Sequence, residues 1–240
     1  MSYRKSLYEH YVSRHTSLIY DISIKTLERQ RRAYRRYFSR FLPKDKSIKI
    51  LDIGSGYGGF LYFLEKEGYK NIFGVDCSQE QVDMSQKLGI KNVVCADIID
   101  TLKKYSEELD VITALDVVEH FQKDELFLLF ESIICALKPG GIFIMQSPNA
   151  DGIFSGRYRY WDLTHEIAFT PTSIRQILLH VGFKEVRIYA TIPVIHGIFS
   201  FLRYVLWQFI RYILILYLAV ETGSFKGHIL TQNLIAVGRR

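Results

Sequence analysis

The sequence predicts an α/β fold built on a mostly parallel β-sheet with helices on both faces. Short apolar runs with strand character alternate along the chain with helix-like segments, which is the pattern of βαβ units. These runs are apolar almost throughout, as expected of strands that are covered on both faces. A hydrophobic content of 48% and a charged content of 23% are typical of a globular domain.

The chain begins with a basic segment. Residues 1–46 contain twelve Lys/Arg and four Asp/Glu, whereas the whole chain has a net charge of +6. Residues 26–42, "TLERQRRAYRRYFSRFL", carry apolar side chains at helical spacing and precede Pro43, so we expect a helix that ends there. We divide the chain into an N-terminal helical segment, 1–45, and a main domain, 46–240. The basic segment suits nucleic acid, an anionic membrane, an anionic substrate or a simple solvated face.

The main domain repeats strand and helix in order. The expected strands are "IKILDI", "NIFGVD", "NVVCAD", "LDVITAL" and "GIFIMQS", and the helices between them are residues 59–67, 78–88, 100–107 and 122–137. A helix in "TPTSIRQILLHVGF" and strands in "KEVRIYAT" and "LTQNLIAVG" follow. A helical insert, residues 191–227, separates these last two strands.

The first strand runs directly into glycines in "KILDIGSGYGGF", residues 49–60. Glycines let a ligand approach the backbone closely, and the following helix offers N–H groups and a positive dipole end. "GSGYGG" also fits the G-x-G-x-x-G pattern of dinucleotide sites. Asp52 distinguishes a dinucleotide site from a site for a cationic ligand. A carboxylate repels a pyrophosphate but attracts a ligand that carries an ammonium or sulfonium group.

With Asp52 followed by Gly54, Gly56 and Gly58, the chain resembles the class I S-adenosylmethionine-dependent methyltransferases. Their first motif is an acidic residue followed by G-x-G-x-G. The stretches "GVDCS", "CADI", "ALDVVEHF" and "LKPGGIFIMQSPN" are similar to four later motifs of that family and occur in the same order. The resemblance implies a Rossmann-like sheet of seven strands, with an antiparallel last strand beside the fifth, and S-adenosylmethionine as the cofactor.

The resemblance also implies individual roles. Asp76 is expected to bind both ribose hydroxyls, with a helix-capping role as the alternative, and Asp97 and Ile98 are expected to contact the adenine. The expected cofactor-binding residues are Asp52, Gly54, Ser55, Gly56, Tyr57, Asp76, Cys77, Asp97, Ile98 and Leu115.

Methyl transfer to a hydroxyl group needs a base that removes the proton, and histidine or a carboxylate is suited to this. "YRYWDLTHEIAFT" resembles a stretch in bacterial methyltransferases that build surface polysaccharides. We expect Asp162 and His165 at the catalytic site, with His165 as the first candidate base and His120 as the second. The alternatives are that His165 caps its loop by bonding Asp162 and that His120 packs beneath the cofactor.

Two further groups of residues have open interpretations. Asp116, Glu119 and His120 resemble a divalent-ion site of ubiquinone-type O-methyltransferases, but hard ions require more oxygens and we expect no metal. Arginine forks bind phosphate or carboxylate, and aromatic rings stack on sugars. We therefore expect a substrate-binding role, or else an ordinary aromatic-rich surface, for the set Arg157, Arg159, Tyr160 and Trp161.

The insert is strongly apolar between residues 191 and 220. Its longest charge-free run, 188–202, contains Pro193 and Gly197, so it is expected to be too short and broken to span a membrane. Polar residues at helical spacing indicate an amphipathic helix with a wide apolar face: Ser200, Arg203, Tyr204, Gln208, Arg211 and Tyr212. Such a helix packs in the core, forms a homodimer seam or lies on a membrane surface.

These observations predict an S-adenosylmethionine-dependent O-methyltransferase acting on a sugar or glycan, either a surface polysaccharide or a lipid-linked precursor. A quinone-precursor or other small-molecule O-methyltransferase and an RNA-binding methyltransferase are the alternatives. We find no RNA-module motif and expect no nucleic-acid partner. The N-terminus lacks the apolar region of a secretory signal, so we expect a cytoplasmic protein. If the insert lies on a membrane, the basic N-terminal helix favours the anionic inner leaflet. We expect the thiols of Cys77, Cys95 and Cys135 to be buried.

Overall fold

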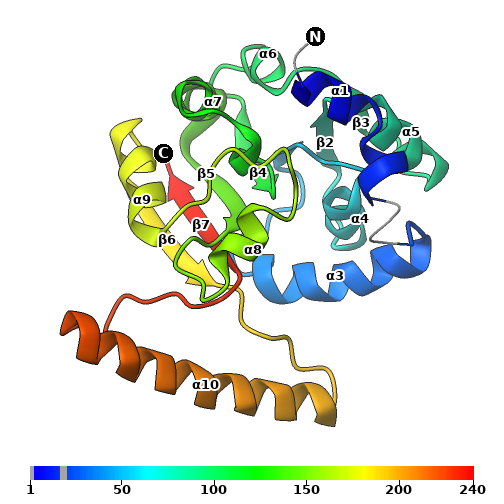
Figure 1. Ribbon diagram of the computed structural model, residues 1–240. Helices are drawn as coiled ribbons and strands as arrows, with labels where there is room; N and C mark the ends of the chain where they lie inside the picture. The colour runs from blue at the N-terminus through cyan, green and yellow to red at the C-terminus, as the bar shows by residue number, and fades with distance from the viewer. Residues whose placement is uncertain (1–2, 17–20) are drawn as a thin grey trace.

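A computed structural model describes residues 3–16 and 21–240 (Figure 1). Its centre is a seven-stranded sheet in the order β3-β2-β1-β4-β5-β7-β6. The strands are β1 (Lys49–Ile53), β2 (Asn71–Asp76), β3 (Val93–Cys95), β4 (Leu109–Leu115), β5 (Leu137–Pro148), β6 (Glu185–Ala190) and β7 (Asn233–Arg239). The pairs from β3 to β5 are parallel, and β7 lies antiparallel between β5 and β6. This arrangement confirms the expected sheet, including the antiparallel last strand beside the fifth.

Helices cover both faces of the sheet. They are α1 (Tyr3–Glu9), the π-helix η1 (Val12–Thr16), α3 (Ile24–Phe38), α4 (Gly59–Lys66), α5 (Gln79–Lys87), α6 (Ile98–Leu102), the 3-10 helix η2 (Val118–His120), α7 (Lys123–Ala136), α8 (Ser155–Arg159), α9 (Pro171–His180) and α10 (Ile198–Thr222). One hydrophobic core includes Phe130 of α7 and Leu178 of α9. The other includes Leu27 of α3 and Phe63 of α4, so α3 from the basic N-terminal segment shares a core with the sheet.

Two expected helices have different ends in the structure. α3 stops at Phe38 rather than continuing to residue 42, because the chain turns to place Phe41 against Tyr189, with ring centroids 4.8 Å apart. α6 begins earlier and ends earlier than expected, because Asp97 caps its first turn by accepting a hydrogen bond from the Asp100 N–H. The expectation of buried thiols is wrong, since the three cysteines are all exposed.

The insert forms one continuous helix, α10, that stands off from the rest of the molecule (Figure 1). This helix is long and apolar enough to cross a membrane, and almost none of it is buried. The expectation of a short, broken segment was therefore wrong. Pro193 and Gly197 both lie before the helix begins, and Arg203 and Arg211 are accommodated within it. The alternative that the insert packs into the core is also wrong, because its apolar side chains are exposed.

Candidate active site

A cavity of about 790 Å³ opens where the parallel strands β1, β2 and β4 end. Ligands of open α/β sheets bind at this edge, where loops from neighbouring strands converge. Every one of the ten residues expected to bind the cofactor lines this cavity. The sequence motifs are spread from residue 52 to residue 115, and the sheet order brings them together.

The loop after β1 depends on glycine. Gly54 has φ +63°, and a Cβ atom there would lie 2.4 Å from Cγ2 of Val117. Gly56 also has a positive φ, and its N–H donates to Oδ2 of Asp76 at 2.8 Å. The loop is therefore held in a left-handed conformation and tied to the end of β2, with its backbone exposed to the cavity.

Asp52 lies at the end of β1 and is almost fully buried. The Thr113 hydroxyl donates to its Oδ1 at 2.5 Å. Burial raises the pKa of Asp52 to about 7, against the lowering effect of the Thr113 hydrogen bond, and the neighbouring Asp76 adds to the rise. A buried carboxylate that ionises so reluctantly is a strong site for a cation, because a positive ligand group supplies the missing counter-charge.

Asp76 ends β2 and orders the loops on either side of it. Its Oδ2 accepts from Gly56 N and its Oδ1 accepts from Ser78 N at 2.9 Å. Burial raises its pKa, and these two hydrogen bonds oppose the rise. Each carboxylate oxygen has a second lone pair, so this positioning role is compatible with the expected contact to two vicinal hydroxyls.

The N-terminal helices form a wall of the cavity that the sequence interpretation did not include. Tyr8, Tyr11 and His15 line the cavity, and they lie at a spacing of three and four residues that places them on one helical side. Glu80 anchors this segment by accepting from the backbone N–H groups of Val12 and Ser13. The helical spacing of these three residues could have indicated that they share one side of a helix. Nothing in the sequence showed that this side turns toward the glycine loop.

His120, Thr164 and Asp162 form a hydrogen-bonded chain beside the cavity. The Thr164 hydroxyl donates to Asp162 Oδ1 at 2.6 Å and lies 2.8 Å from Nδ1 of His120. Because that hydroxyl has one proton and Asp162 is an acceptor, Nδ1 of His120 donates to Thr164 in this arrangement. The backbone of Asp116 is a further hydrogen-bond partner of this ring.

The protonation states of this chain suit a base. Burial, followed by the neighbouring His165, lowers the pKa of His120 to about 4, so its imidazole is neutral at pH 7. The pKa of Asp162 is also lowered, since hydrogen bonds from Thr164 and Tyr11 outweigh the burial that opposes them. Asp162 accepts from the Tyr11 hydroxyl at 2.6 Å, which connects the chain to the N-terminal wall.

His165 lies behind His120, with 4.8 Å between the ring centroids. His120 lines the cavity, and His165 is outside that lining. The His165 ring bonds the carbonyl of Tyr158 through Nδ1 at 3.1 Å, and its backbone N–H donates to the carbonyl of Asp162. The expected loop-capping bond to Asp162 is therefore made by the backbone of His165 rather than by its ring.

The pKa values of the acidic residues near His120 are also shifted. Desolvation by the surrounding protein raises the pKa of Asp116, and a hydrogen bond from Gln146 Nε2 to its Oδ2 at 2.9 Å opposes the rise. Burial raises the pKa of Glu119 well above its ordinary value. Glu119, His120 and His165 offer ligand atoms within 4.8 Å of one another. A hard divalent ion takes six or more oxygen ligands, so the absence of a metal from the reaction stays our prediction.

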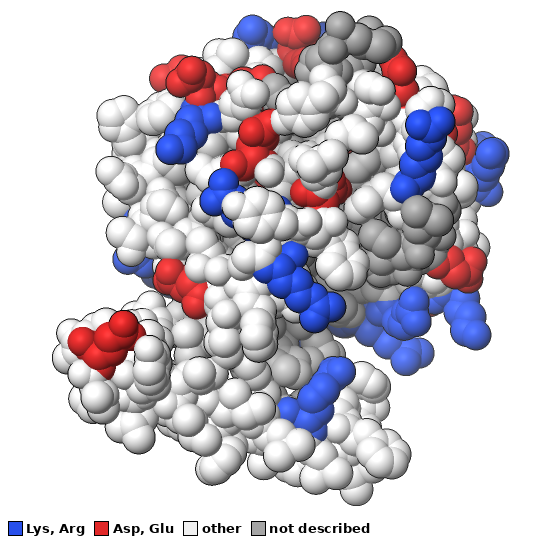
Figure 2. Space-filling model, viewed as in Figure 1, with Lys and Arg blue, Asp and Glu red and all other residues white. Residues whose placement is uncertain are grey.

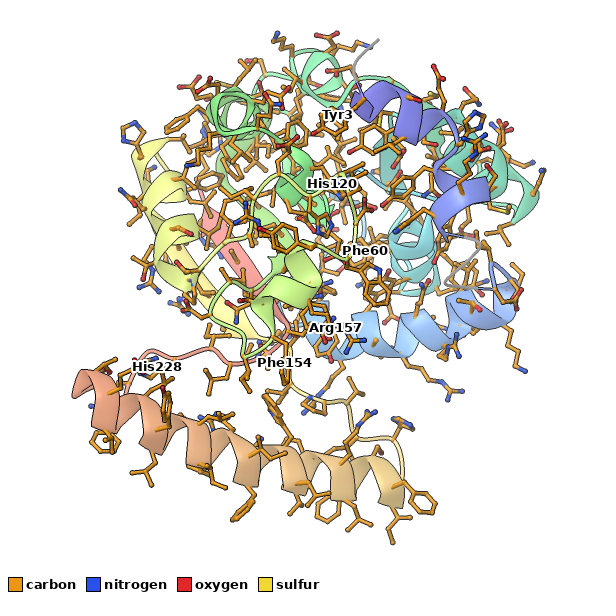
Figure 3. The ribbon with its side chains drawn as sticks, viewed as in Figure 1. Tyr3, Phe60, His120, Phe154, Arg157 and His228 are labelled. Atoms are coloured by element: carbon orange, nitrogen blue, oxygen red, sulfur yellow. The ribbon has the colours of Figure 1, made fainter. Side chains whose placement is uncertain are left out.

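The expected substrate residues lie on and beside α8, outside the cavity lining. Arg157 is on the edge of the body that faces α10, well away from His120 (Figure 3). The guanidinium of Arg157 lies 5.8 Å from the ring of Trp161, and that of Arg159 lies 5.5 Å from the ring of Tyr160. These side chains form an exposed aromatic and cationic surface, which we call the α8 surface. A role for it in substrate binding remains a prediction.

Comparisons with known proteins agree with this geometry. A family model described as "Methyltransferase domain" matches residues 26–188. Phosphoethanolamine N-methyltransferase 3 of Arabidopsis thaliana is 28% identical over 149 residues, which is 58% of this chain and 29% of that protein. A probable pectin methyltransferase of the same plant is 31% identical over 135 residues, which is 53% of this chain and 19% of that protein. This chain thus spans less than a third of either curated relative.

Solved structures share the fold. A SAM-dependent methyltransferase from Archaeoglobus fulgidus superposes with a TM-score of 0.67 and 24% identity, over 89% of this chain and 94% of that one. Phosphoethanolamine N-methyltransferase 2 of Haemonchus contortus, in complex with S-adenosyl-L-methionine, gives a TM-score of 0.62 and 17% identity, over 97% of this chain and 60% of that one.

The fold and the cavity are those of a class I S-adenosylmethionine-dependent methyltransferase. The chain belongs to the methyltransferase-domain family, whose model matches more than half of it. S-adenosylmethionine is the cofactor of this class, and the residues present fit it: a glycine loop free of Cβ atoms, a buried carboxylate for a cation and a second carboxylate for hydroxyl groups.

Proposed function

We propose that this protein transfers a methyl group to a hydroxyl of a sugar or glycan acceptor. The observation that carries the proposal is the chain from His120 through Thr164 to Asp162 at the wall of the cavity. A hydroxyl acceptor must lose its proton during transfer, and a neutral imidazole held by a threonine and a carboxylate is suited to remove it.

S-adenosylmethionine supplies an activated methyl group on a sulfonium centre. Asp52 would hold a positive group of the cofactor, Asp76 would accept from its ribose hydroxyls, and the backbone of Gly54 and Gly56 would allow close contact. These residues fix the position of the donor, and alignment of two reactants supplies a large part of the rate in such displacements.

His120 would act as the general base and Asp162 as a positioning residue behind it. The expectation named His165 first, but the structure favours His120, which lines the cavity while His165 does not. Thr164 links the two, so the imidazole is fixed in orientation by the same loop that carries Asp162.

The nature of the acceptor rests on the α8 surface and on one relative. Arg157 and Arg159 beside Tyr160 and Trp161 offer flat aromatic faces and cationic forks, which suit sugars and anionic groups. The matched pectin methyltransferase is named for a glycan. A surface polysaccharide or its lipid-linked precursor, methylated in the cytoplasm, is the acceptor class that we propose.

A small phosphorylated amine is the second candidate acceptor. The matched phosphoethanolamine N-methyltransferases favour it, and the α8 arginines would suit its phosphate. Nitrogen methylation of such a substrate would use the same cofactor site.

Methyl-labelled S-adenosylmethionine tests these candidates directly. The protein is incubated with the donor and with separate pools of nucleotide sugars, lipid-linked oligosaccharides, phenols and phosphoethanolamine. We expect label in a sugar pool, as a methyl ether that NMR assigns to one ring position. Label only on the amine nitrogen of phosphoethanolamine would replace the proposal with the second candidate.

A further inference from the structure

The helix α10 has its polar and apolar sides reversed relative to a helix on a soluble protein. Its polar side chains Tyr204, Gln208 and Arg211 face the body, where they line a small cavity with the segment 228–231. The opposite side is exposed and apolar along its whole length: Phe199, Leu202, Leu206, Phe209, Ile213, Leu216 and Val220. Exposing such a row to water is unfavourable, so an apolar environment is expected to cover it.

A row of cations lies on the neighbouring helix α3 (Figure 1). Four exposed cations of α3 are spaced by three or four residues, on the side of the helix opposite the buried Leu27 and Phe38: Lys25, Arg29, Arg32 and Arg36. Among the described residues, none of these side chains forms an ion pair, whereas Arg31 and Arg35 of the same helix both pair with Glu67. We name these four residues the α3 cation row.

The α3 cation row lies close to the N-terminal half of α10 (Figure 1). The Tyr37 hydroxyl of α3 donates to the carbonyl of Ile192, just before α10, at 2.9 Å. Arg36 of α3 and Arg203 of α10 both lie near that hydroxyl. Figure 1 shows α3 along the lower edge of the body directly above the N-terminal half of α10, and Figure 2 shows blue side chains along that edge.

The segments before and after α10 lead to neighbouring strands, which argues against a membrane-spanning arrangement. The strands β6 and β7 that flank it are paired neighbours, with Ala190 opposite Leu234. A spanning helix would have to bring residues 223–232 back through about 30 Å of hydrocarbon as an extended chain, with Lys226 and every backbone group unpaired. This connectivity favours a helix that lies in the plane of an interface.

We propose that α10 and the α3 cation row together form a docking surface for an anionic lipid bilayer. The apolar side of α10 enters the boundary between head groups and acyl chains, and the cations of α3 contact anionic head groups. A second copy of the chain fits less well, because a partner helix would cover α10 alone while bringing a second set of cations close to the first.

Vesicle flotation of the full chain tests this docking. We expect binding to vesicles of phosphatidylcholine mixed with phosphatidylserine, weaker binding to phosphatidylcholine alone, and loss of binding as salt shortens the screening length. Residence in the soluble fraction with anionic vesicles at low salt, or equal binding to neutral and anionic vesicles, would overturn the proposal. Neither result depends on which acceptor is methylated.

Two pairs of variants assign the binding to the two elements. Leu206→Glu with Phe209→Glu is expected to weaken partitioning more than about tenfold, because two apolar side chains no longer enter the lipid. Leu128→Glu, at an exposed site on α7 far from α10, is the matched control and should leave partitioning unchanged.

The cations of α3 are tested in the same assay. Arg32→Gln and Arg36→Gln should each lower the partition coefficient about fivefold, whereas Lys104→Gln, on the opposite side of the molecule, should leave it unchanged.

The depth of α10 in the bilayer and the oligomeric state of the protein distinguish in-plane docking from a spanning helix and from a dimer. With Trp161→Phe and Trp207→Phe in place, a tryptophan at position 209 (Phe209→Trp) should be quenched more by lipids brominated near the head group than near the chain end. Stronger quenching from the chain end would indicate spanning and contradict the in-plane arrangement. Sedimentation equilibrium that shows a dimer dissociated by Leu206→Glu, without vesicle binding, would assign the surface to a second copy instead.

Discussion

Asp52 is a buried carboxylate whose ionisation depends on what occupies the cavity. Its raised pKa of about 7 means that the folded protein without ligand keeps a proton that the unfolded chain loses near pH 4. The folded state thus binds more protons between about pH 4 and 7, and the free energy of unfolding falls as pH rises across that window. A cationic ligand reverses this preference, because it favours the charged form.

Cofactor affinity is therefore expected to rise with pH. If the ionised form of Asp52 binds S-adenosylmethionine, the affinity measured by calorimetry should be roughly tenfold higher at pH 8 than at pH 6. Asp52→Asn should bind weakly with a flat pH dependence, yet be more stable than wild type at pH 8, by up to about 4 kcal/mol in urea unfolding. An Asp52→Asn variant that binds the cofactor as wild type does would disprove the cation assignment.

His120 and His165 are neighbours that the structure places differently relative to the cavity. His120→Gln should lower kcat by about 100-fold or more with little change in cofactor affinity, since it removes the base. His165→Gln should lower kcat by less than about tenfold. The opposite ranking of the two variants in steady-state assays would assign the base to His165.

The pH profile of the wild-type enzyme tests the same base. Because the pKa of His120 is about 4, the base stays deprotonated above pH 5, and activity should be lost only as pH falls through 4.

At the scale of elements, the turn from β1 into α4 determines whether the cavity exists. Gly54→Ala adds a Cβ 2.4 Å from Val117 to a backbone with φ +63°. We expect it to cost about 3 kcal/mol or more in denaturant unfolding and to abolish cofactor binding, through strain and clash together. Gly68→Ala is the matched control, with φ +91° and nothing within 4 Å of the added atom. It should cost only about 1 kcal/mol and leave binding intact, and equal losses in both variants would contradict the clash.

The N-terminal helices are a second element on which the site depends. Tyr11→Phe removes a hydrogen bond to the Asp162 carboxylate, which is worth about 1.5–3 kcal/mol for a charged acceptor. We expect faster amide hydrogen exchange in residues 3–16 and weaker cofactor binding. Tyr37→Phe, which removes a hydrogen bond to the Ile192 carbonyl on the α10 side, should leave both measurements unchanged. Unaltered exchange in Tyr11→Phe would show that the N-terminal wall does not depend on Asp162.

At the scale of the whole molecule, the cavity and the proposed lipid-facing surface are joined by α3. One side of this helix carries the α3 cation row, and another supplies Gln30, whose Nε2 donates to the Tyr57 hydroxyl at the cavity at 2.7 Å. Arg157 and Phe154 lie at the edge of the body that faces α10, with Phe154 nearer to the helix (Figure 3). A lipid-linked acceptor would reach the α8 surface from that side.

The cofactor half of the site was predictable because its signals are local. Asp52 and Asp76 lie at the ends of apolar strands, and Asp97 follows the next one. Because parallel strands end at one edge, pattern and topology together place these residues around one cavity. The acceptor half was less predictable. His120 and Thr164 are joined across 44 residues, and the ranking of the two histidines depended on a contact that no local pattern encodes.

From the sequence, apolar periodicity and backbone freedom predicted the alternating strands and helices and the glycine loop, because these signals act over a few residues. The resemblance of five ordered motifs to a known family implied the seven-stranded sheet and the cofactor. Only the tertiary structure decided that the N-terminal helices close the cavity, that His120 rather than His165 faces it, and that α10 turns its apolar side outward. The physical reason is that periodicity defines two sides of a helix but not which of them faces the protein, and that choice depends on contacts between residues far apart in the chain.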